Sequence, residues 1–328
     1  DKLVSVIIPA YNASAHLERT LTSIIAQDYG SLEVIIVNDA STDSSLEIAH
    51  KVLSGSARPH RIITLPQNLV VSCARNTGLK AARGEYVWFC DADDLVDERF
   101  LRVLCGEAQG KNADIVFCGL THYYEDSGKF VDEKINAVNM TSPEEYFEAW
   151  ADDKLYLWSV WNFIFRRDFL RKSNLHFSEG CIYGEDAEFV MKAVALASRV
   201  LFVRDILYIY IHHKSQTIAK RKEPAMMHSL LLARFRMWRF VLRHTTRRSV
   251  KNYVLNFCLP DTLVNKFTSC AKAGDRERYT RLTRCLKHKR VREILLSSVR
   301  FIAKKPELFF KFLALAYAQK LYYVLRKG

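Results

Sequence analysis

The chain has 328 residues, of which 49% are hydrophobic and 26% are charged. This balance is typical of a folded globular protein and excludes a disordered or collagen-like chain. The net charge of +13 is unevenly placed, because residues 1–220 carry 23 Lys and Arg against 30 Asp and Glu, whereas residues 221–328 carry 26 against 6. We therefore expect a globular part followed by a segment that binds polyanions.

The eight cysteines show no CxxC pair and no regular spacing, and several lie in apolar runs such as the one that ends at Cys90. They are expected to be reduced core residues. The first residues lack the pattern of a secretion signal, and no uninterrupted apolar stretch is long enough to cross a bilayer. These features favour a cytoplasmic protein.

Short β-branched runs alternate with helical patterns in the first third of the chain. The predicted strands are residues 4–8, 34–37, 61–65 and 86–90, and the predicted helices between them are residues 14–27, 43–53 and 72–82. Later strands are predicted at residues 114–118, 159–165 and 200–203, and later helices at residues 143–150 and 185–197. The alternation indicates an α/β fold with a mostly parallel sheet. Such sheets bind ligands beyond the carboxyl ends of their strands, so the residues after each run are candidates.

Polar loops follow the first two predicted strands and are expected to lie side by side. The first loop contains Pro9 and Tyr11, and the second contains Asp39. An aromatic ring beside a carboxylate suits a nucleobase, which offers a face for stacking and an N–H for a hydrogen bond. In the second loop, Asp43 is predicted to be the N-cap of the next helix.

The acidic triplet Asp91-Ala92-Asp93 follows the fourth predicted strand. Two carboxylates at this spacing, at the end of a buried strand, can hold a hard divalent cation such as Mn²⁺ or Mg²⁺ that also binds diphosphate oxygens. Acidic residues after a strand also commonly cap the next helix, so the triplet by itself leaves both interpretations open.

The order of four motifs is more specific than any one of them. The motifs are residues 4–12 (VSVIIPAYN), 34–43 (VIIVNDASTD), 74–78 (ARNTG) and 91–94 (DADD). In this order they resemble the family 2 glycosyltransferases of the GT-A fold, over roughly residues 3–218. The resemblance implies a Rossmann-like sheet flanked by helices, with a mainly helical C-terminal extension in this chain.

The same resemblance implies roles for the donor-site residues. Pro9, Tyr11 and Asp39 are expected to form the nucleoside pocket, and Asp91, Ala92 and Asp93 to contact the ribose and the metal. Arg75 is expected on the diphosphate side or as a residue that orders the loop, with Asn68 among the donor-binding residues. The chain departs from the family at Val70 and Ala40, where glycine is usual or frequent, so the local backbone is in question there.

A second acidic pair, Glu185-Asp186, opens a predicted helix and resembles the Glu-Asp motif of the family. An inverting transfer needs a carboxylate that takes the proton of the acceptor hydroxyl. The resemblance implies Asp186 as this base, and Glu185 is assigned to the acceptor side. The alternative is that both acids only favour the positive end of the helix.

Two tryptophans, Trp158 and Trp161, flank a predicted strand and are candidates to stack on an acceptor sugar, with core packing as the alternative. Residues 208–217 follow the last predicted strand and resemble the family segment that closes over the diphosphate. The resemblance implies diphosphate contacts from His213, Lys214 and Ser215, and a metal contact from His213. Solvated loop residues are the alternative.

The basic region, residues 221–328, combines apolar and cationic side chains at helical spacing. This pattern suits helices that lie on an anionic membrane surface. Packing on the catalytic domain with a solvated basic face is the alternative. Nucleic-acid binding is less favoured because no recognised module accompanies the charge. We divide the chain into a donor-binding half (1–98), an acceptor-binding half (99–220) and this region.

The sequence thus predicts an inverting, metal-dependent glycosyltransferase that uses a nucleoside diphosphate sugar, expected to be a UDP-sugar. The expected acceptor is a saccharide on a lipid-linked precursor of a surface polysaccharide, at the inner face of the cell membrane. A non-catalytic membrane-associated scaffold and a sugar nucleotidyltransferase are the alternatives. The latter usually has a Gly-rich phosphate loop after its first strand, and a dehydrogenase would need GxGxxG there. The residues after this strand, PAYN, fit neither.

Overall fold

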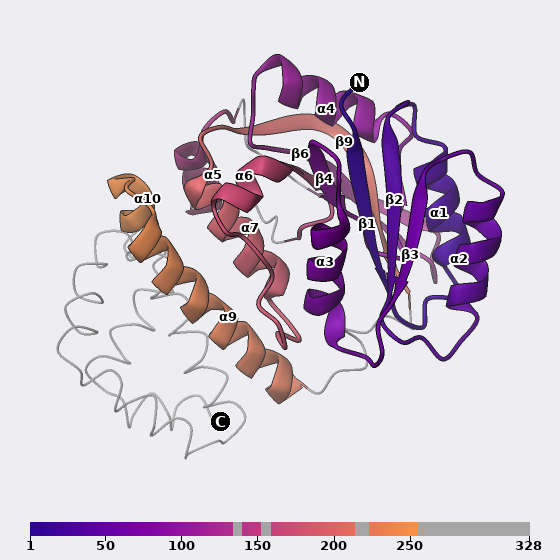
Figure 1. Ribbon diagram of the computed structural model, residues 1–328. Coiled ribbons are helices and arrows are strands. Elements are labelled where there is room, and N and C mark those ends of the chain that lie inside the picture. The colour runs from indigo at the N-terminus through magenta and orange to yellow at the C-terminus, as the bar shows by residue number, and fades with distance from the viewer. Residues whose placement is uncertain (134–139, 152–158, 214–222, 255–328) are drawn as a thin grey trace. The chain divides into compact units, whose positions relative to one another are not determined.

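The computed structural model describes residues 1–133, 140–151, 159–213 and 223–254 (Figure 1). Its strands are β1 (Val4–Ala10), β2 (Leu32–Asn38), β3 (His60–Thr64), β4 (Tyr86–Phe89), β5 (Leu95–Val96), β6 (Ile115–Tyr124), β7 (Lys129–Asp132), β8 (Phe163–Arg166) and β9 (Val200–His212). Its helices are α1 (Leu17–Ile25), α2 (Ser45–Ser54), α3 (Val70–Ala81), α4 (Phe100–Gly110), α5 (Pro143–Ala151), α6 (Arg167–Lys172), α7 (Glu185–Leu196), α9 (Glu223–His244) and α10 (Arg248–Tyr253).

The first four strands form the parallel sheet that the sequence predicts. Their order in the sheet is β3-β2-β1-β4, and every neighbouring pair is parallel. The register pairs Ala10 with Asn38, so β1 and β2 end at the same edge of the sheet. Helices α1 and α2 lie on one side of these strands and α3 on the other (Figure 1). The loops that carry the predicted donor residues therefore meet at one edge.

Close packing holds α3 against the sheet. The Cβ atom of any residue larger than glycine at Gly78 would lie 2.3 Å from Cγ2 of Ile7 in β1, so the helix depends on the missing side chain to approach the strand. On β4, Val87, Trp88 and Phe89 are fully buried. The acidic triplet thus follows a strand with a fixed, dry environment.

The second half of the sheet mixes strand directions. It continues from β4 in the order β8-β6-β9-β5, with β7 paired to β6. The β6–β9 pair is parallel, whereas β4–β8, β6–β8, β6–β7 and β5–β9 are antiparallel. A mixed sheet of this kind places β9 beside the acidic triplet, because the short β5 that pairs with β9 begins directly after Asp94.

Several predicted elements need correction. The last strand does not end at residue 203, because β9 continues to His212 past a register shift opposite Cys118 and Gly119. Residues 208–212 are therefore part of the strand rather than a segment that follows it. Strand β6 extends to Tyr124, β8 begins only at Phe163, and β5, β7, α4 and α6 are elements that the sequence pattern did not predict.

The described cysteines agree with the predicted reduced core: Cys73, Cys90, Cys105, Cys118 and Cys181 are free, and all but Cys73 are buried. Two compact units divide the chain, residues 1–233 and 234–328. The boundary between these units falls within α9. The described part of the basic region is helical, in α9 and α10, and residues 255–328 lie outside the described residues. None of the described helices combines the length and apolar character needed to cross a membrane.

Candidate active site

The loops after β1 and β2 are joined by hydrogen bonds. The backbone N–H of Asn12 donates to Oγ of Ser41 (3.1 Å), and the N–H of Thr42 donates to Oδ1 of Asn12 (2.8 Å). The carboxylate of Asp43 accepts the N–H groups of Ser14 and Ser45, both at 3.0 Å. Asp43 thus ties the loops together, and the N-cap position of α2 is Ser44 rather than the predicted Asp43.

The predicted nucleoside residues lie around these loops with different exposures. Tyr11 is 47% exposed, whereas Asp39 is buried and accepts the N–H of Leu69 at 2.8 Å through Oδ1. Pro9 is the penultimate residue of β1, and Oδ1 of Asn68 accepts the N–H of Val70 at 3.3 Å. Asp39 therefore joins the end of β2 to the start of α3, beside an exposed aromatic ring.

The two departures from the family pattern coincide with unusual backbone. Ala40 has φ of 57° and Val70 has φ of 62°, both in the left-handed region that glycine adopts without strain. Val70 is the more strained of the two, because it is β-branched. The family's preference for glycine at these places thus has a local backbone cause in this chain.

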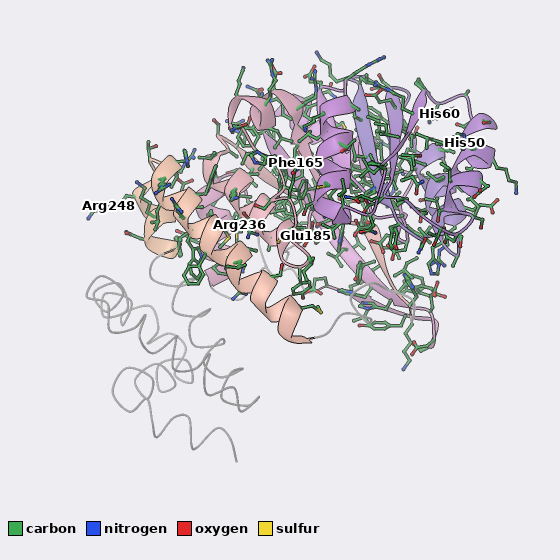
Figure 2. All side chains as sticks on the ribbon, turned by 60° about the horizontal axis from the view of Figure 1, so that its bottom comes forward. His50, His60, Phe165, Glu185, Arg236 and Arg248 are labelled. Atoms are coloured by element: carbon green, nitrogen blue, oxygen red, sulfur yellow. The ribbon has the colours of Figure 1, made fainter. Side chains whose placement is uncertain are left out.

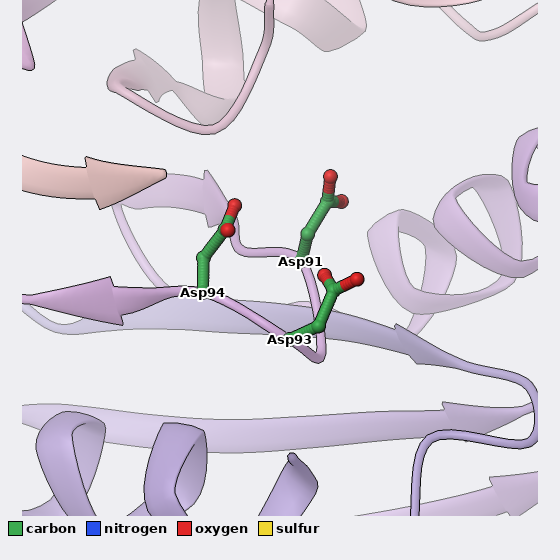
Figure 3. Close-up of side chains that lie close together, drawn as sticks. All are labelled: Asp91, Asp93 and Asp94. Carbon is green, nitrogen blue, oxygen red and sulfur yellow. The ribbon is translucent and has the colours of Figure 1, made fainter. Parts of the chain in front are cut away.

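The acidic triplet and its neighbour form one cluster (Figure 3). Asp91, Asp93 and Asp94 each place one carboxylate oxygen within 4.8 Å of the others. Asp94 is fully buried and accepts the Tyr208 hydroxyl (2.8 Å) and the N–H of Ile211 (2.9 Å). Its two oxygens are used to hold β9, so the predicted ligands Asp91 and Asp93 are the members of the cluster whose carboxylates do not bond to this strand.

Arg75 connects the triplet to the predicted base. Its buried guanidinium donates to Asp91 at 2.8 Å, to Glu185 at 3.4 Å and to Asp186. It also lies 5.3 Å from the centre of the Phe177 ring. The acidic pair opens α7, whose first residue, Glu185, is labelled in Figure 2. Residues from α3, the end of β4 and α7 thus meet at one side chain, Arg75.

Three carboxylates around one guanidinium leave an excess of negative charge in a poorly solvated place. Burial raises the pKa of Asp186 well above its ordinary value, although Arg75 acts in the opposite direction. Burial also raises the pKa of Asp91, again opposed by Arg75. Burial alone would lower the pKa of Arg75, but the carboxylates outweigh it and raise that pKa, so the guanidinium stays charged. Such shifted carboxyls are common at catalytic sites.

A pair of histidines, His213 and His16, lies beside the triplet. Nε2 of His213 lies 2.8 Å from Oδ2 of Asp93, and its Nδ1 lies 3.2 Å from Nε2 of His16. Arg19 forms an ion pair with Glu125 at 2.7 Å, and Glu125 lies 3.8 Å from Nδ1 of His16. His213 is therefore next to the triplet, as predicted.

The sequence patterns did not point to His16 or Glu125 as site residues. His16 and Glu125 belong to no motif, and more than a hundred residues separate them along the chain. Asp94 had a weak signal, since it continues the acidic run of Asp91 and Asp93. Only the fold shows that Asp94 bonds to β9, whereas Asp91 accepts from Arg75 and Asp93 lies beside His213.

The acceptor-side predictions are only partly described. Trp161 is 7% exposed and stacks on Tyr208, with ring centres 4.3 Å apart. Its carbonyl oxygen accepts the indole N–H of Trp88 at 2.6 Å. Packing therefore accounts for most of its surface. Trp158, Lys214 and Ser215 lie outside the described residues.

Helix α9 fixes the loop before the predicted base. The hydroxyl of Ser229 accepts the N–H groups of Ile182 (3.2 Å) and Tyr183 (3.1 Å), and it lies 3.0 Å from the carbonyl of Tyr183. The next residue, Gly184, has φ of 87°, and a Cβ there would lie 2.8 Å from Leu230. The start of α9 thus belongs to the site, which the sequence division at residue 220 did not anticipate.

Comparisons with known proteins show the family to which the chain is similar. The model of glycosyl transferase family 2 matches residues 5–181. The uncharacterized glycosyltransferase EpsJ of Bacillus subtilis is 35% identical over 227 residues, which are 68% of this chain and 65% of EpsJ. Glycosyltransferase GlyA of Streptococcus pneumoniae is 31% identical over 239 residues, which are 70% of this chain and 33% of GlyA. The chain thus spans less than two thirds of the length of either relative.

A solved structure shows the same fold. S. aureus TarS in complex with UDP-GlcNAc aligns with a TM-score of 0.72 and 19% sequence identity, over 99% of this chain and 89% of that one. The α/β fold with helices around a central sheet is therefore confirmed, including its GT-A type.

Proposed function

Because this chain belongs to glycosyl transferase family 2, we propose that it transfers a sugar, with inversion, from a nucleoside diphosphate donor to a saccharide hydroxyl. The observation that carries the proposal is Arg75, which holds a donor-side carboxylate, Asp91, and an acceptor-side carboxylate, Asp186, in one cluster. A transferase needs these two groups on opposite sides of the bond that breaks.

The donor is proposed to be a UDP-sugar. The exposed ring of Tyr11 offers a stacking surface, and Asp39, anchored by Leu69, offers a carboxylate to a base N–H. Asn68, in the loop before α3, and Pro9, in β1, are proposed as further donor contacts. The complex of TarS with UDP-GlcNAc supports uridine as the nucleoside.

The cation site is proposed at Asp91 and Asp93, with His213 as a third ligand. The carboxylates fit a hard divalent ion such as Mn²⁺ or Mg²⁺, and the third acid, Asp94, is committed to β9. A cation bound there would neutralise charge on the departing diphosphate. Ala92, between the ligands, is 8% exposed, and its carbonyl accepts the Thr20 hydroxyl at 3.1 Å, which fixes the turn.

Asp186 is proposed as the catalytic base. Its carboxylate takes the proton of the acceptor hydroxyl while that oxygen bonds to the anomeric carbon, and the bond from this carbon to the diphosphate breaks on the opposite side. The raised pKa of Asp186 makes it a stronger base than an ordinary aspartate. Arg75 and the neighbouring Glu185 keep it oriented, and Glu185 contributes a second polar group on the acceptor side.

The experiment begins with a screen of nucleotide sugars for donor hydrolysis with Mn²⁺ or Mg²⁺, and calorimetry with UDP and Mn²⁺. In the Asp186→Asn variant, transfer and hydrolysis should fall about 10²- to 10⁴-fold while UDP affinity is retained. Asp168→Asn, an exposed acid at the start of α6, is the matched control and should behave as the parent. Near-parental transfer by Asp186→Asn would overturn the base assignment, and absence of metal-dependent UDP binding would favour the scaffold alternative.

The biological setting is also a proposal. We infer a lipid-linked precursor of a surface polysaccharide as the acceptor and a peripheral position on the inner face of the cell membrane. The support is the charge of the basic region, 26 Lys and Arg against 6 Asp and Glu over residues 221–328.

A further inference from the structure

One face of the β6–β9 pair carries a row of aromatic rings. The register places His122 opposite Tyr210 and Tyr124 opposite His212, and residues two apart on a strand share a face. We call these four residues together with Trp161 the aromatic strip. All but Trp161 are partly exposed.

The rings of the aromatic strip touch in sequence. Trp161 stacks on Tyr210, with centres 5.3 Å apart and planes within 10°. Tyr210 meets His212 edge to face at 4.8 Å, and His212 stacks on Tyr124 at 4.3 Å with planes within 4°. His122 fills the remaining corner, 5.1 Å from His212. The contacts make the strip a continuous and pre-arranged surface.

The strip lies beside the acidic triplet, because Tyr208 and Ile211 of β9 both bond to Asp94 and His213, the next residue after His212, lies 2.8 Å from Asp93. Trp161, at one end of the strip, also stacks on Tyr208, whose hydroxyl donates to Asp94. The other end lies on the β6–β7 hairpin, where Val131 is 50% exposed. The steps between ring centres from Trp161 through Tyr210 and His212 to Tyr124 are 5.3, 4.8 and 4.3 Å, so this row of four rings is longer than a single pyranose ring.

Polar groups line the edge of the strip. Nδ1 of His122 lies 2.9 Å from Nε2 of His212, and its Nε2 lies 2.9 Å from Oε2 of Glu133, whose side chain is 27% exposed. Aromatic faces beside carboxylate, imidazole and phenol groups suit sugar rings, which present C–H faces and hydroxyl edges. A lipid surface would instead favour an apolar or cationic protein face. The carboxylate of Glu133 at the edge of the strip does not fit such a face.

We propose that the aromatic strip binds the saccharide part of the acceptor over more than one sugar unit. The inference rests on the proposed transferase function and deepens it, because it makes the acceptor an oligosaccharide that lies along β6 and β9 with its reacting end at the triplet. The strip supplies binding at a distance from the reacting hydroxyl, so it sets affinity for long acceptors.

The chain supplies a matched control on the same strand. Tyr123 is adjacent to Tyr124 but points to the opposite face, where its ring lies 4.7 Å from Phe130. Tyr124→Ala and Tyr123→Ala therefore remove the same side chain from the same hairpin, and only the first removes it from the aromatic strip.

The experiment measures binding of the full chain to an array of mono- to hexasaccharides in the presence of UDP and Mn²⁺, which provide no sugar to transfer. The parent should bind longer saccharides more tightly than monosaccharides. Tyr124→Ala should weaken binding of tri- and longer saccharides at least tenfold, whereas Tyr123→Ala should not. Calorimetry with UDP reports the fold and the donor site of each variant.

The outcomes separate the two proposals. Three outcomes would overturn the role of the aromatic strip alone: Tyr124→Ala binds saccharides as tightly as the parent, both variants lose the same affinity, or the parent binds UDP but no saccharide. A parent that binds neither UDP nor saccharides would overturn the proposed function as well.

Discussion

At Arg75 one buried guanidinium faces three carboxylates, from Asp91, Glu185 and Asp186. The arrangement is not an ordinary ion pair, because the acids outnumber the base in a place with little water. Removing the guanidinium leaves buried carboxylates without a counter-charge, which is much more costly than losing a surface pair.

We therefore expect Arg75→Met to lower the free energy of unfolding by about 3–5 kcal/mol at neutral pH, measured by urea denaturation. Raised pKa values mean that Asp91 and Asp186 take up protons as the pH falls, so the loss should become smaller in acid. Arg171→Met, at an exposed pair with Asp168, is the control and should remain close to the parent. A loss that does not depend on pH would contradict this charge account.

The base itself gives a second prediction. Asp186 must be ionised to accept a proton, and burial raises its pKa. The value of kcat/KM should therefore rise with pH through a pKa above that of an ordinary aspartate. A pH–rate profile of donor-saturated transfer checks it, and a flat profile down to about pH 4 would be inconsistent with the assigned base.

Backbone strain at Val70 gives a third prediction. Its φ of 62° is unfavourable for a β-branched residue, whereas glycine adopts it freely. Val70→Gly should raise the free energy of unfolding by about 0.5–1 kcal/mol, less than the relieved strain because glycine is more flexible when unfolded. Val71→Gly, inside α3, should have the opposite sign. Both are measurable by urea denaturation.

Among elements, those with strong patterns were predictable. The alternation in the first third predicts β1 to β4 and α1 to α3 within a few residues, because β1, β2 and β4 contain buried apolar runs and Leu17, Leu21 and Ile24 give α1 an apolar face. The predicted strand ended at residue 203, whereas β9 continues to His212. The apolar run is interrupted after residue 203 by Arg204 and Asp205, at the irregular pairing with β6. The hairpin strand β7 is exposed along its whole length, so burial left no pattern to find.

Site residues within sequence motifs were predictable, whereas contacts between distant parts of the chain were not. Motif order located Asp39, Arg75, Asp91, Asp93 and Asp186, and the structure brings the last four into one cluster. What sequence could not supply was the contact between distant elements, such as Asp94 with Tyr208 or His213 with His16, because these depend on how the second half of the sheet folds back.

The contact of α9 with the loop before α7 is an element-scale feature with its own prediction. Ser229→Ala removes the hydroxyl that binds Ile182 and Tyr183, which should cost about 1–3 kcal/mol of stability and lower kcat more than it changes UDP affinity. Ser23→Ala, whose hydroxyl bonds to Thr20 within the α1 region, is the control. Unchanged kcat with reduced stability would show that Ser229 only supports the fold.

At the scale of the whole molecule, positive and negative side chains are divided unevenly along the chain. Residues 221–328 carry a net charge near +20 and residues 1–220 one near −7. The full chain should sediment with vesicles containing anionic phospholipid but not with purely zwitterionic vesicles, and salt near 1 M should release it. Equal binding to both vesicle types would exclude a role for the charge.

Strand β9 limits how this molecule can vary. It bonds to Asp94 through Tyr208 and Ile211, is followed by His213 at Asp93, and carries two rings of the aromatic strip. Because side chains alternate between faces, inserting or deleting one residue after the irregular pairing would turn these groups to the wrong side together. Changes within β9 are therefore restricted to the replacement of one residue by another, without insertion or deletion.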